Sequence, residues 1–255
     1  MKAGRPSLTA RSVALSRSRL NRPQTPEGDP EAELRLYQGL RPRPPLSLVL
    51  GWGIPTRDRT QFVDEEVLQA IAQGVVQVVI VGAGYDGRPL RFRKPGVRFF
   101  EIDHPATQAD KRRRVELAGG AVDYVTFIAA DLTHDNLETV LAAAGHNPAL
   151  PSLFICEGVL VYLPAKAVER LLTGLRAGAA MGSRLVLSAV ERDSNPNVRD
   201  WMRQAILAAI GEPRRSRFGL GEIDQLLTGS SWTVVREISQ ARDGRRRLLV
   251  AAEPV

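Results

Sequence analysis

The chain has 255 residues, of which 44% are hydrophobic, and a formal net charge of +7 at pH 7. This length can bury one large core, and no stretch approaches eighteen uncharged apolar residues, so we expect a cytoplasmic protein without a membrane segment. Cys156 is the only cysteine, which excludes a disulfide within the chain and a cysteine-based zinc cage, and no histidine spacing suggests a metal.

The positive charge comes almost entirely from arginine. Only four of the 35 basic residues are lysine, so 35 − 4 = 31 are arginine, and these are spread over the whole length. A nucleic-acid partner or an acidic substrate would fit this charge, but scattered solvated arginines fit it better.

Helical patterns dominate the first part of the chain. Residues 8–20 and 31–40 have helical spacing, and Asp29 before Pro30 is a typical helix start. Residues 46–60 are too irregular to assign, and residues 61–73 again repeat apolar positions at a helical period. We therefore expect residues 1–60 to form a helical N-terminal extension or lid on a main domain of residues 61–255.

Short apolar runs alternate with helical patterns from residue 75 onward. The predicted strands are residues 75–81, 97–102, 124–129, 153–157 and 184–190. The predicted helices are residues 106–117, 135–144 and 165–180. This alternation predicts an α/β fold, Rossmann-like, with a mostly parallel sheet covered on both faces.

The last predicted strands have a different connection. Residues 232–238 and 246–252 flank a segment with Asp243-Gly244, which is a hairpin signal. A hairpin requires antiparallel strands, so the final strand should run against the others.

A glycine-rich turn follows the first predicted strand in VVIVGAGYDGRPLRF. Gly82 and Gly84 permit a tight turn and a close approach by a ligand where ligands bind in open parallel sheets. Asp103 ends the next strand, where a carboxylate can accept both hydroxyls of a ribose. These features suit NAD and S-adenosylmethionine equally.

Later acidic residues favour one of the two ligands. Asp131 and Leu132 follow the third predicted strand, where they could flank an adenine ring, and Glu157 ends the fourth. Acidic residues at three successive strand ends suit a ligand with sulfonium and ammonium groups, whereas they would repel a pyrophosphate. The terminal hairpin is also typical of methyltransferase sheets.

Five segments together resemble the leucine carboxyl methyltransferase family and its bacterial polyketide O-methyltransferase relatives. They are RTQFVDEEVLQAI, VVIVGAGYDGRPLRF, FFEIDHPATQADKRR, AADL and CEGVLVYLPAKAVERLL. The resemblance covers about residues 9–190 and fades toward the C-terminus. It implies a class I methyltransferase fold, S-adenosyl-L-methionine as the cofactor, and a methyltransferase domain over residues 61–255.

The resemblance also implies roles for single residues. Arg59 resembles the arginine that binds the methionine carboxylate of the cofactor. Gly82 and Gly84 resemble the glycines beneath its methionine moiety, and Asp103 resembles the acceptor of its ribose hydroxyls.

The resemblance also implies roles for residues that follow the third and fourth predicted strands. Asp131 and Leu132 resemble the adenine contacts, and Glu157 resembles the acidic residue at the methionine end. Tyr162 would lie beside the transferred methyl group or its acceptor, as a catalytic residue. Gly87 departs from the family, in which many members carry threonine.

Each of these residues could instead have a purely structural role. Asp103 and Asp131 could each cap the helix that follows, and Arg59 could belong to an ordinary surface pair near Asp58. Glu157 is harder to explain structurally, because a buried carboxylate is costly without partners.

The sequence thus predicts an S-adenosylmethionine-dependent methyltransferase that acts on an oxygen of a small-molecule or peptide acceptor. A carboxylate acceptor is slightly favoured over a hydroxyl, since no residue stands out as a general base. An NAD-binding oxidoreductase remains an alternative, as does a non-enzymatic binding relative. A nucleic-acid methyltransferase is disfavoured because CEGVLVY replaces the Asn/Asp-Pro-Pro-aromatic tetrapeptide. We expect residues 195–229 to cover the acceptor pocket.

Overall fold

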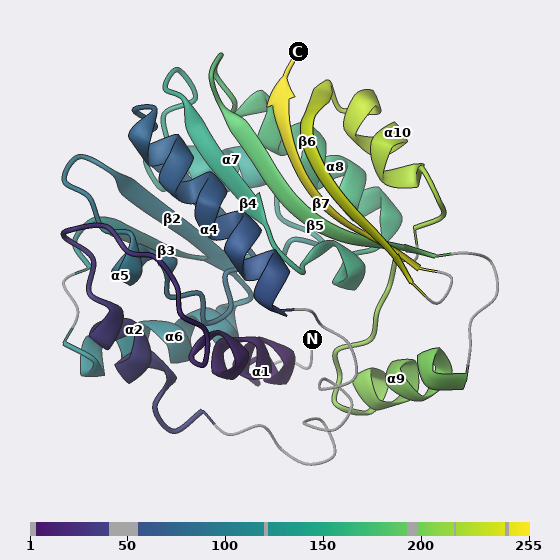
Figure 1. Ribbon diagram of the computed structural model, residues 1–255, viewed down its shortest axis with the longest axis horizontal. Helices are drawn as coiled ribbons and strands as arrows, with labels where there is room; N and C mark the ends of the chain where they lie inside the picture. The colour runs from purple at the N-terminus through teal and green to yellow at the C-terminus, as the bar shows by residue number, and fades with distance from the viewer. Residues whose placement is uncertain (1–3, 41–55, 120–121, 193–197, 217, 243–244) are drawn as a thin grey trace.

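A seven-stranded sheet forms the centre of the computed structural model (Figure 1). The structure describes residues 4–40, 56–119, 122–192, 198–216, 218–242 and 245–255. None of the helices in these ranges is both long and apolar enough to cross a membrane.

The sheet has the predicted mixture of parallel and antiparallel strands. Its strands are β1 (Gln77–Val81), β2 (Arg98–Asp103), β3 (Val125–Ala129), β4 (Ser152–Cys156), β5 (Arg184–Arg192), β6 (Trp232–Arg242) and β7 (Arg245–Pro254). Their order is β3-β2-β1-β4-β5-β7-β6, and β1 to β5 are parallel. Strand β7 lies between β5 and β6 and is antiparallel to both, as expected for the final strand. The predicted turn at Asp243-Gly244 lies outside the described residues.

Helices cover both faces of the sheet, as the alternating sequence pattern predicted. They are α1 (Leu8–Arg17), α2 (Pro30–Tyr37), α4 (Thr56–Ala72), α5 (Arg88–Arg91), α6 (Pro105–Leu117), α7 (Leu137–Ala143), α8 (Ala165–Ala177), α9 (Val198–Ala209) and α10 (Glu222–Gly229). Figure 1 shows α4 across the near face and α7 and α8 behind the sheet. Helices α9 and α10 were not predicted from the sequence.

Separate apolar clusters lie on the two faces. Phe62, Val67 and Val78 belong to the cluster between α4 and the sheet, whereas Phe154 and Leu172 belong to the cluster beneath α8. Consecutive residues of β1 alternate between the two clusters, because side chains of a strand point to opposite faces in turn. A third cluster joins α1 and α2 to the loop after β1 and to α6.

Candidate functional site

A pocket of about 380 Å³ lies at the carboxyl ends of the parallel strands. The loops after β1, β2, β3 and β4 and the end of β5 line it, together with α1 and the segment after α9. All eight residues singled out from the sequence line this one pocket: Arg59, Gly82, Gly84, Asp103, Asp131, Leu132, Glu157 and Tyr162. Their individual roles stay predictions.

Backbone N–H groups donate hydrogen bonds to both carboxylate oxygens of Asp103. The backbone N–H of Gly84 donates to Oδ2 at 2.6 Å, and that of His104 donates to Oδ1 at 2.7 Å. Each carboxylate oxygen keeps lone-pair capacity for a ligand hydroxyl. Burial raises the pKa of Asp103 although these two hydrogen bonds oppose the shift. The residue that caps α6 is His104, so Asp103 is not the helix cap.

The packing of the protein itself explains why the two loop glycines lack a side chain. Their φ angles are +65° at Gly82 and +53° at Gly84, in the left-handed region. A Cβ on Gly82 would lie 2.7 Å from Cγ2 of Val159, and one on Gly84 would lie 2.8 Å from Cβ of Ala10. Internal packing therefore also requires glycine at both positions, and a close approach of a ligand to them stays a prediction.

Glu157 lies just past β4 and is surrounded by arginines. Arg17 and Arg88 contact its Oε2 at 2.6 and 2.7 Å, and Arg59 contacts Oε1 at 2.7 Å. Burial alone would raise the pKa of Glu157, but the charges of Arg17, Arg88 and Arg59 outweigh it and hold the pKa well below its usual value. The partners that sequence reasoning could not find for this buried carboxylate are therefore arginines.

These contacts belong to a larger ionic cluster beneath the pocket. The cluster consists of Arg17, Arg22, Arg59, Arg88, Arg91, Glu33, Asp64, Asp86 and Glu157. Counted over these described residues, five arginines face four carboxylates, which leaves one positive charge in excess. An anionic ligand group in the pocket would balance that charge.

Arg17 is a site residue that sequence reasoning missed. It is buried, it lines the pocket, and its Nε–H is buried without a hydrogen-bond partner among the described residues. Thr9 and Val13 precede it at four-residue intervals on α1 and line the same pocket. Because that spacing places side chains on one helix face, this stripe was the signal available in the sequence.

Asp131 stabilises a turn beside the pocket. Its Oδ1 accepts hydrogen bonds from the N–H of Thr133 at 2.9 Å and from its hydroxyl at 2.6 Å. Helix α7 is capped by Asn136, so Asp131 is not the helix cap. Leu132 packs against the apolar cluster beneath α8, and both residues line the pocket.

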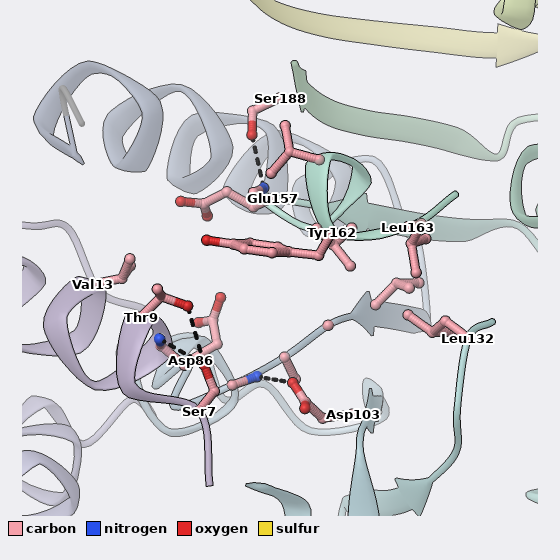
Figure 2. Close-up of a pocket in the computed structure, with 18 of the residues that line it drawn as sticks. Ser7, Thr9, Val13, Asp86, Asp103, Leu132, Glu157, Tyr162, Leu163 and Ser188 are labelled. Carbon is pink, nitrogen blue, oxygen red and sulfur yellow. Dashed lines mark hydrogen bonds between the residues drawn. The ribbon is translucent and has the colours of Figure 1, made fainter. Parts of the chain in front are cut away.

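Tyr162 lies in the pocket near the start of α1. It ends the short 3-10 helix η1 (Leu160–Tyr162) and lines the pocket together with Thr9. Figure 2 shows the Tyr162 hydroxyl directed toward α1, on the side where Thr9 and Val13 lie. Burial raises the pKa of the Tyr162 phenol.

Beyond Tyr162, the pocket is bounded by the antiparallel part of the sheet. Val190, Ile238 and Leu249 supply apolar surface there. Arg247 pairs with Val190 across β5 and β7 and also lines the pocket, as does Arg214. The charge of Arg214 opposes the raised pKa of the Tyr162 phenol, and both residues line the pocket.

The family and the relatives that match this chain are all named as methyltransferases. Residues 54–176 match the leucine carboxyl methyltransferase family. A protein of Streptomyces avermitilis, named as a candidate S-adenosyl-L-methionine-dependent methyltransferase, is 44% identical over 137 residues, covering 52% of this chain and 48% of its own. A protein of the same description from Mycobacterium avium is 33% identical over 187 residues, covering 69% and 58%. The chain thus spans about half the length of the curated relatives it matches.

Solved structures share the fold. A candidate methyltransferase from Thermobifida fusca superposes with a TM-score of 0.61 at 14% identity, covering 99% of this chain and 96% of its own. Magnesium protoporphyrin IX methyltransferase from Synechocystis, with bound S-adenosylhomocysteine, gives 0.52 at 18% identity, covering 81% and 91%. At such identities the likeness shows a class I methyltransferase fold and nothing finer.

Proposed function

We propose that this chain, whose residues 54–176 match the leucine carboxyl methyltransferase family, binds S-adenosyl-L-methionine and methylates an oxygen of its acceptor. The observation that carries the proposal is the chemistry of the pocket's two ends. Asp103 offers hydrogen-bond acceptors at one end, while Arg17 and the surplus charge of the ionic cluster lie at the other.

The residues present fit this cofactor. The free lone pairs of Asp103 suit the two ribose hydroxyls. The buried Nε–H of Arg17 and the net positive charge around Glu157 suit the methionine carboxylate, and the remaining capacity of Glu157 suits its ammonium group. When bound, the cofactor supplies an activated methyl group on a sulfonium. The protein then has to align the acceptor and exclude water.

A carboxylate is the better supported acceptor. A hydroxyl would need a general base, but Asp86 and Glu157 are each paired with arginines, and the pKa of Asp86 is lowered to about 2 because its arginine contacts outweigh burial. Glu212 is occupied by hydrogen bonds from the first residues of α1. A carboxylate is already ionised at neutral pH and needs no base.

The wall beyond Tyr162 supports an acidic acceptor with an apolar body. Arg214 and Arg247 offer positive charge, and Val190, Ile238 and Leu249 offer apolar surface. Helix α1 and the segment after α9 both contribute to the pocket lining, in keeping with an N-terminal extension of residues 1–60 and a covering segment within residues 195–229.

Binding is the first test. Calorimetric titration of the protein with S-adenosylhomocysteine and, separately, with NAD should show saturable binding of the former only. Binding of NAD without S-adenosylhomocysteine would instead establish a dinucleotide-binding protein and reject the proposal.

Transfer is the second test. The protein is incubated with methyl-labelled cofactor and matched pairs of apolar acids and the corresponding alcohols, with RNA and DNA as further arms. Label that base treatment releases as volatile methanol identifies a methyl ester, whereas an ether resists base. Base-stable label on the alcohols alone would reject a carboxylate acceptor while keeping the methyltransferase.

A further inference from the structure

The antiparallel part of the sheet contributes an arginine to the pocket. Arg247 lies on β7, lines the pocket and is half-buried. Within the part of the chain that the structure describes, its guanidinium group takes part in no ion pair. Arg17 and Arg59 line the same pocket, but both bind Glu157. Arg247 therefore places a positive charge at the pocket that no described carboxylate contacts.

The strand register places Arg247 away from the end of the pocket that holds Glu157. The hydroxyl of Ser188 on β5 accepts the N–H of Gly158 at 2.9 Å (Figure 2). Val190 lies two residues farther along β5, and Arg247 is directly opposite Val190 on the neighbouring strand. The backbone of Arg247 therefore lies about 7 Å beyond Ser188 along the strands and about 5 Å to one side.

Apolar side chains surround Arg247 on its face of the sheet. Residues directly opposite one another in antiparallel strands point to the same face, as do residues two apart on one strand. Val190, Leu249 and Ile238 therefore share a face with Arg247, and all four residues line the pocket. This wall of the pocket thus combines apolar surface with an arginine that has no described ionic partner.

The carboxylate that receives the methyl group is a poor partner for such an arginine. In the transfer, an acceptor oxygen bonds to the methyl carbon, the carbon–sulfur bond breaks with its electron pair left on sulfur, and no proton moves. The carboxylate thereby loses its charge, so an ion pair with it would stabilise the substrate more than the transition state. An acidic group elsewhere on the acceptor keeps its charge and its ion pair throughout.

We propose that Arg247 determines acceptor specificity by binding a second acidic group, at the opposite end of the acceptor from the carboxylate that is methylated. The inference rests on the proposed function and narrows it to acceptors with two acidic groups joined by an apolar body. The guanidinium fork suits a carboxylate or a phosphate-type group, since both accept two parallel hydrogen bonds. The product is the monoester, because a second methylation would place the uncharged ester against Arg247.

Matched acceptors test the inference on the wild-type protein. Octanoate carries one acid, ω-hydroxyoctanoate adds a neutral polar group, and octanedioate adds a second carboxylate. Diacids from hexanedioate to dodecanedioate vary the length, and an ω-phosphonoalkanoate distinguishes a phosphate-type group from a carboxylate. Methyl ester formation should have a kcat/KM about 10-fold higher for the best acid with two acidic groups than for the first two acceptors. Calorimetric titration of these acids into protein saturated with S-adenosylhomocysteine should give the same order of affinity.

Three variants assign the preference to one residue. Arg247→Gln removes the charge and should abolish most of the preference for the second acidic group. Arg247→Lys keeps a positive charge without the planar fork and should retain part of it. Arg112→Met removes an exposed arginine of α6 and is the control for net charge, so it should retain the full preference.

Several outcomes would overturn the inference and leave the proposed function intact. One is a wild-type protein that binds S-adenosylhomocysteine but neither binds nor methylates any of the acids with two acidic groups better than octanoate. Another is a full preference in an Arg247→Gln variant that a thermal melt shows to be folded. If that variant does not fold, an unchanged preference in Arg247→Lys together with complete conversion of diacids to diesters has the same effect. A wild-type protein that does not bind S-adenosylhomocysteine would overturn both proposals.

Discussion

The environment of Gly87 explains why this position lacks a side chain. A Cβ at Gly87 would lie 2.3 Å from Cγ and 2.5 Å from Oε1 of Glu33. Glu33 cannot easily move, because Arg22 and Arg91 bind its carboxylate. The absence of a side chain at Gly87 therefore leaves the space that the buried side chain of Glu33 in α2 occupies.

Gly87→Thr should destabilise the fold by about 1–3 kcal/mol, because the added atoms overlap Glu33 in a closely packed region. The free energy of unfolding in urea measures this effect. Gly229→Thr is the control, since no atom lies within 4 Å of a Cβ built there. Equal loss of stability in both variants would contradict the steric explanation.

Asp103→Ala should weaken binding of S-adenosylhomocysteine by about 1–3 kcal/mol, because two hydrogen bonds to ribose hydroxyls would be lost. Calorimetric titration measures the change, and a thermal melt checks that the loop held by the Gly84 contact still folds. Glu116→Ala, on the exposed face of α6, is the control. Unchanged affinity in a folded Asp103→Ala variant would reject the ribose role.

At the scale of elements, β2 and α6 share a buried ionic contact behind the glycine loop. Lys111 Nζ lies 2.6 Å from Oε1 of Glu101 and donates to the backbone oxygen of Asp86 at 2.6 Å. The other oxygen of Glu101 and the side-chain oxygen of Gln108 are buried without partners in the described chain. Burial raises the pKa of Glu101 to about 7 although Lys111 opposes the shift.

This raised pKa predicts how stability depends on pH. The folded protein keeps the Glu101 proton up to about pH 7, whereas the unfolded chain releases it near 4.5. The contribution of this group is fully present below about 4.5 and is lost as the pH rises through about 7, by roughly 3 kcal/mol in total.

Unfolding free energies of the wild type and Glu101→Gln, measured between pH 4 and 8 (about the range of this transition), test the prediction. Glu101→Gln has no carboxyl proton to release, so its unfolding free energy should not fall in this way as the pH rises. Its stability relative to the wild type should therefore increase with pH. Parallel pH profiles would show that Glu101 titrates at an ordinary pKa.

For the whole molecule, the ionic cluster connects the N-terminal helices to the sheet edge that carries the pocket. Arg22, which precedes α2, contacts both Glu33 and Asp64, and Asp64 in turn contacts Arg88 beside Glu157. The N-terminal segment therefore supplies part of the positive charge that compensates the buried carboxylates at the pocket.

Arg22→Met should cost about 3 kcal/mol of unfolding free energy, because it leaves buried carboxylates undercompensated. The value lies at the low end of the range for broken buried pairs, since Arg91 and Arg88 still hold Glu33 and Asp64. Arg112→Met is the matched control: its pair with Glu116 is 67% and 57% exposed, and its loss should cost less than about 1 kcal/mol. Similar costs for the two variants would contradict the argument.

The periodicity of apolar residues was enough to predict the strands and most helices, and the Asp243-Gly244 hairpin signal predicted the antiparallel end of the sheet, because these patterns are local. The positions of Gly82, Asp103 and Glu157 at strand ends followed from the same reasoning, since parallel strands bring their carboxyl ends to one edge. Helices α9 and α10 were not predicted, because residues 195–229 carried no pattern that we could assign.

Only the tertiary structure decided which partners these residues have. Glu157 is neutralised by Arg17, 140 positions away, and Glu212 closes the start of α1 from 203 positions beyond Thr9. Ion pairs and hydrogen bonds act over a few ångströms, whereas a sequence pattern reports only the period of one segment. The sequence alone therefore determined the sheet and the edge where the pocket lies, and the folded chain determined the charges and hydrogen bonds that line it.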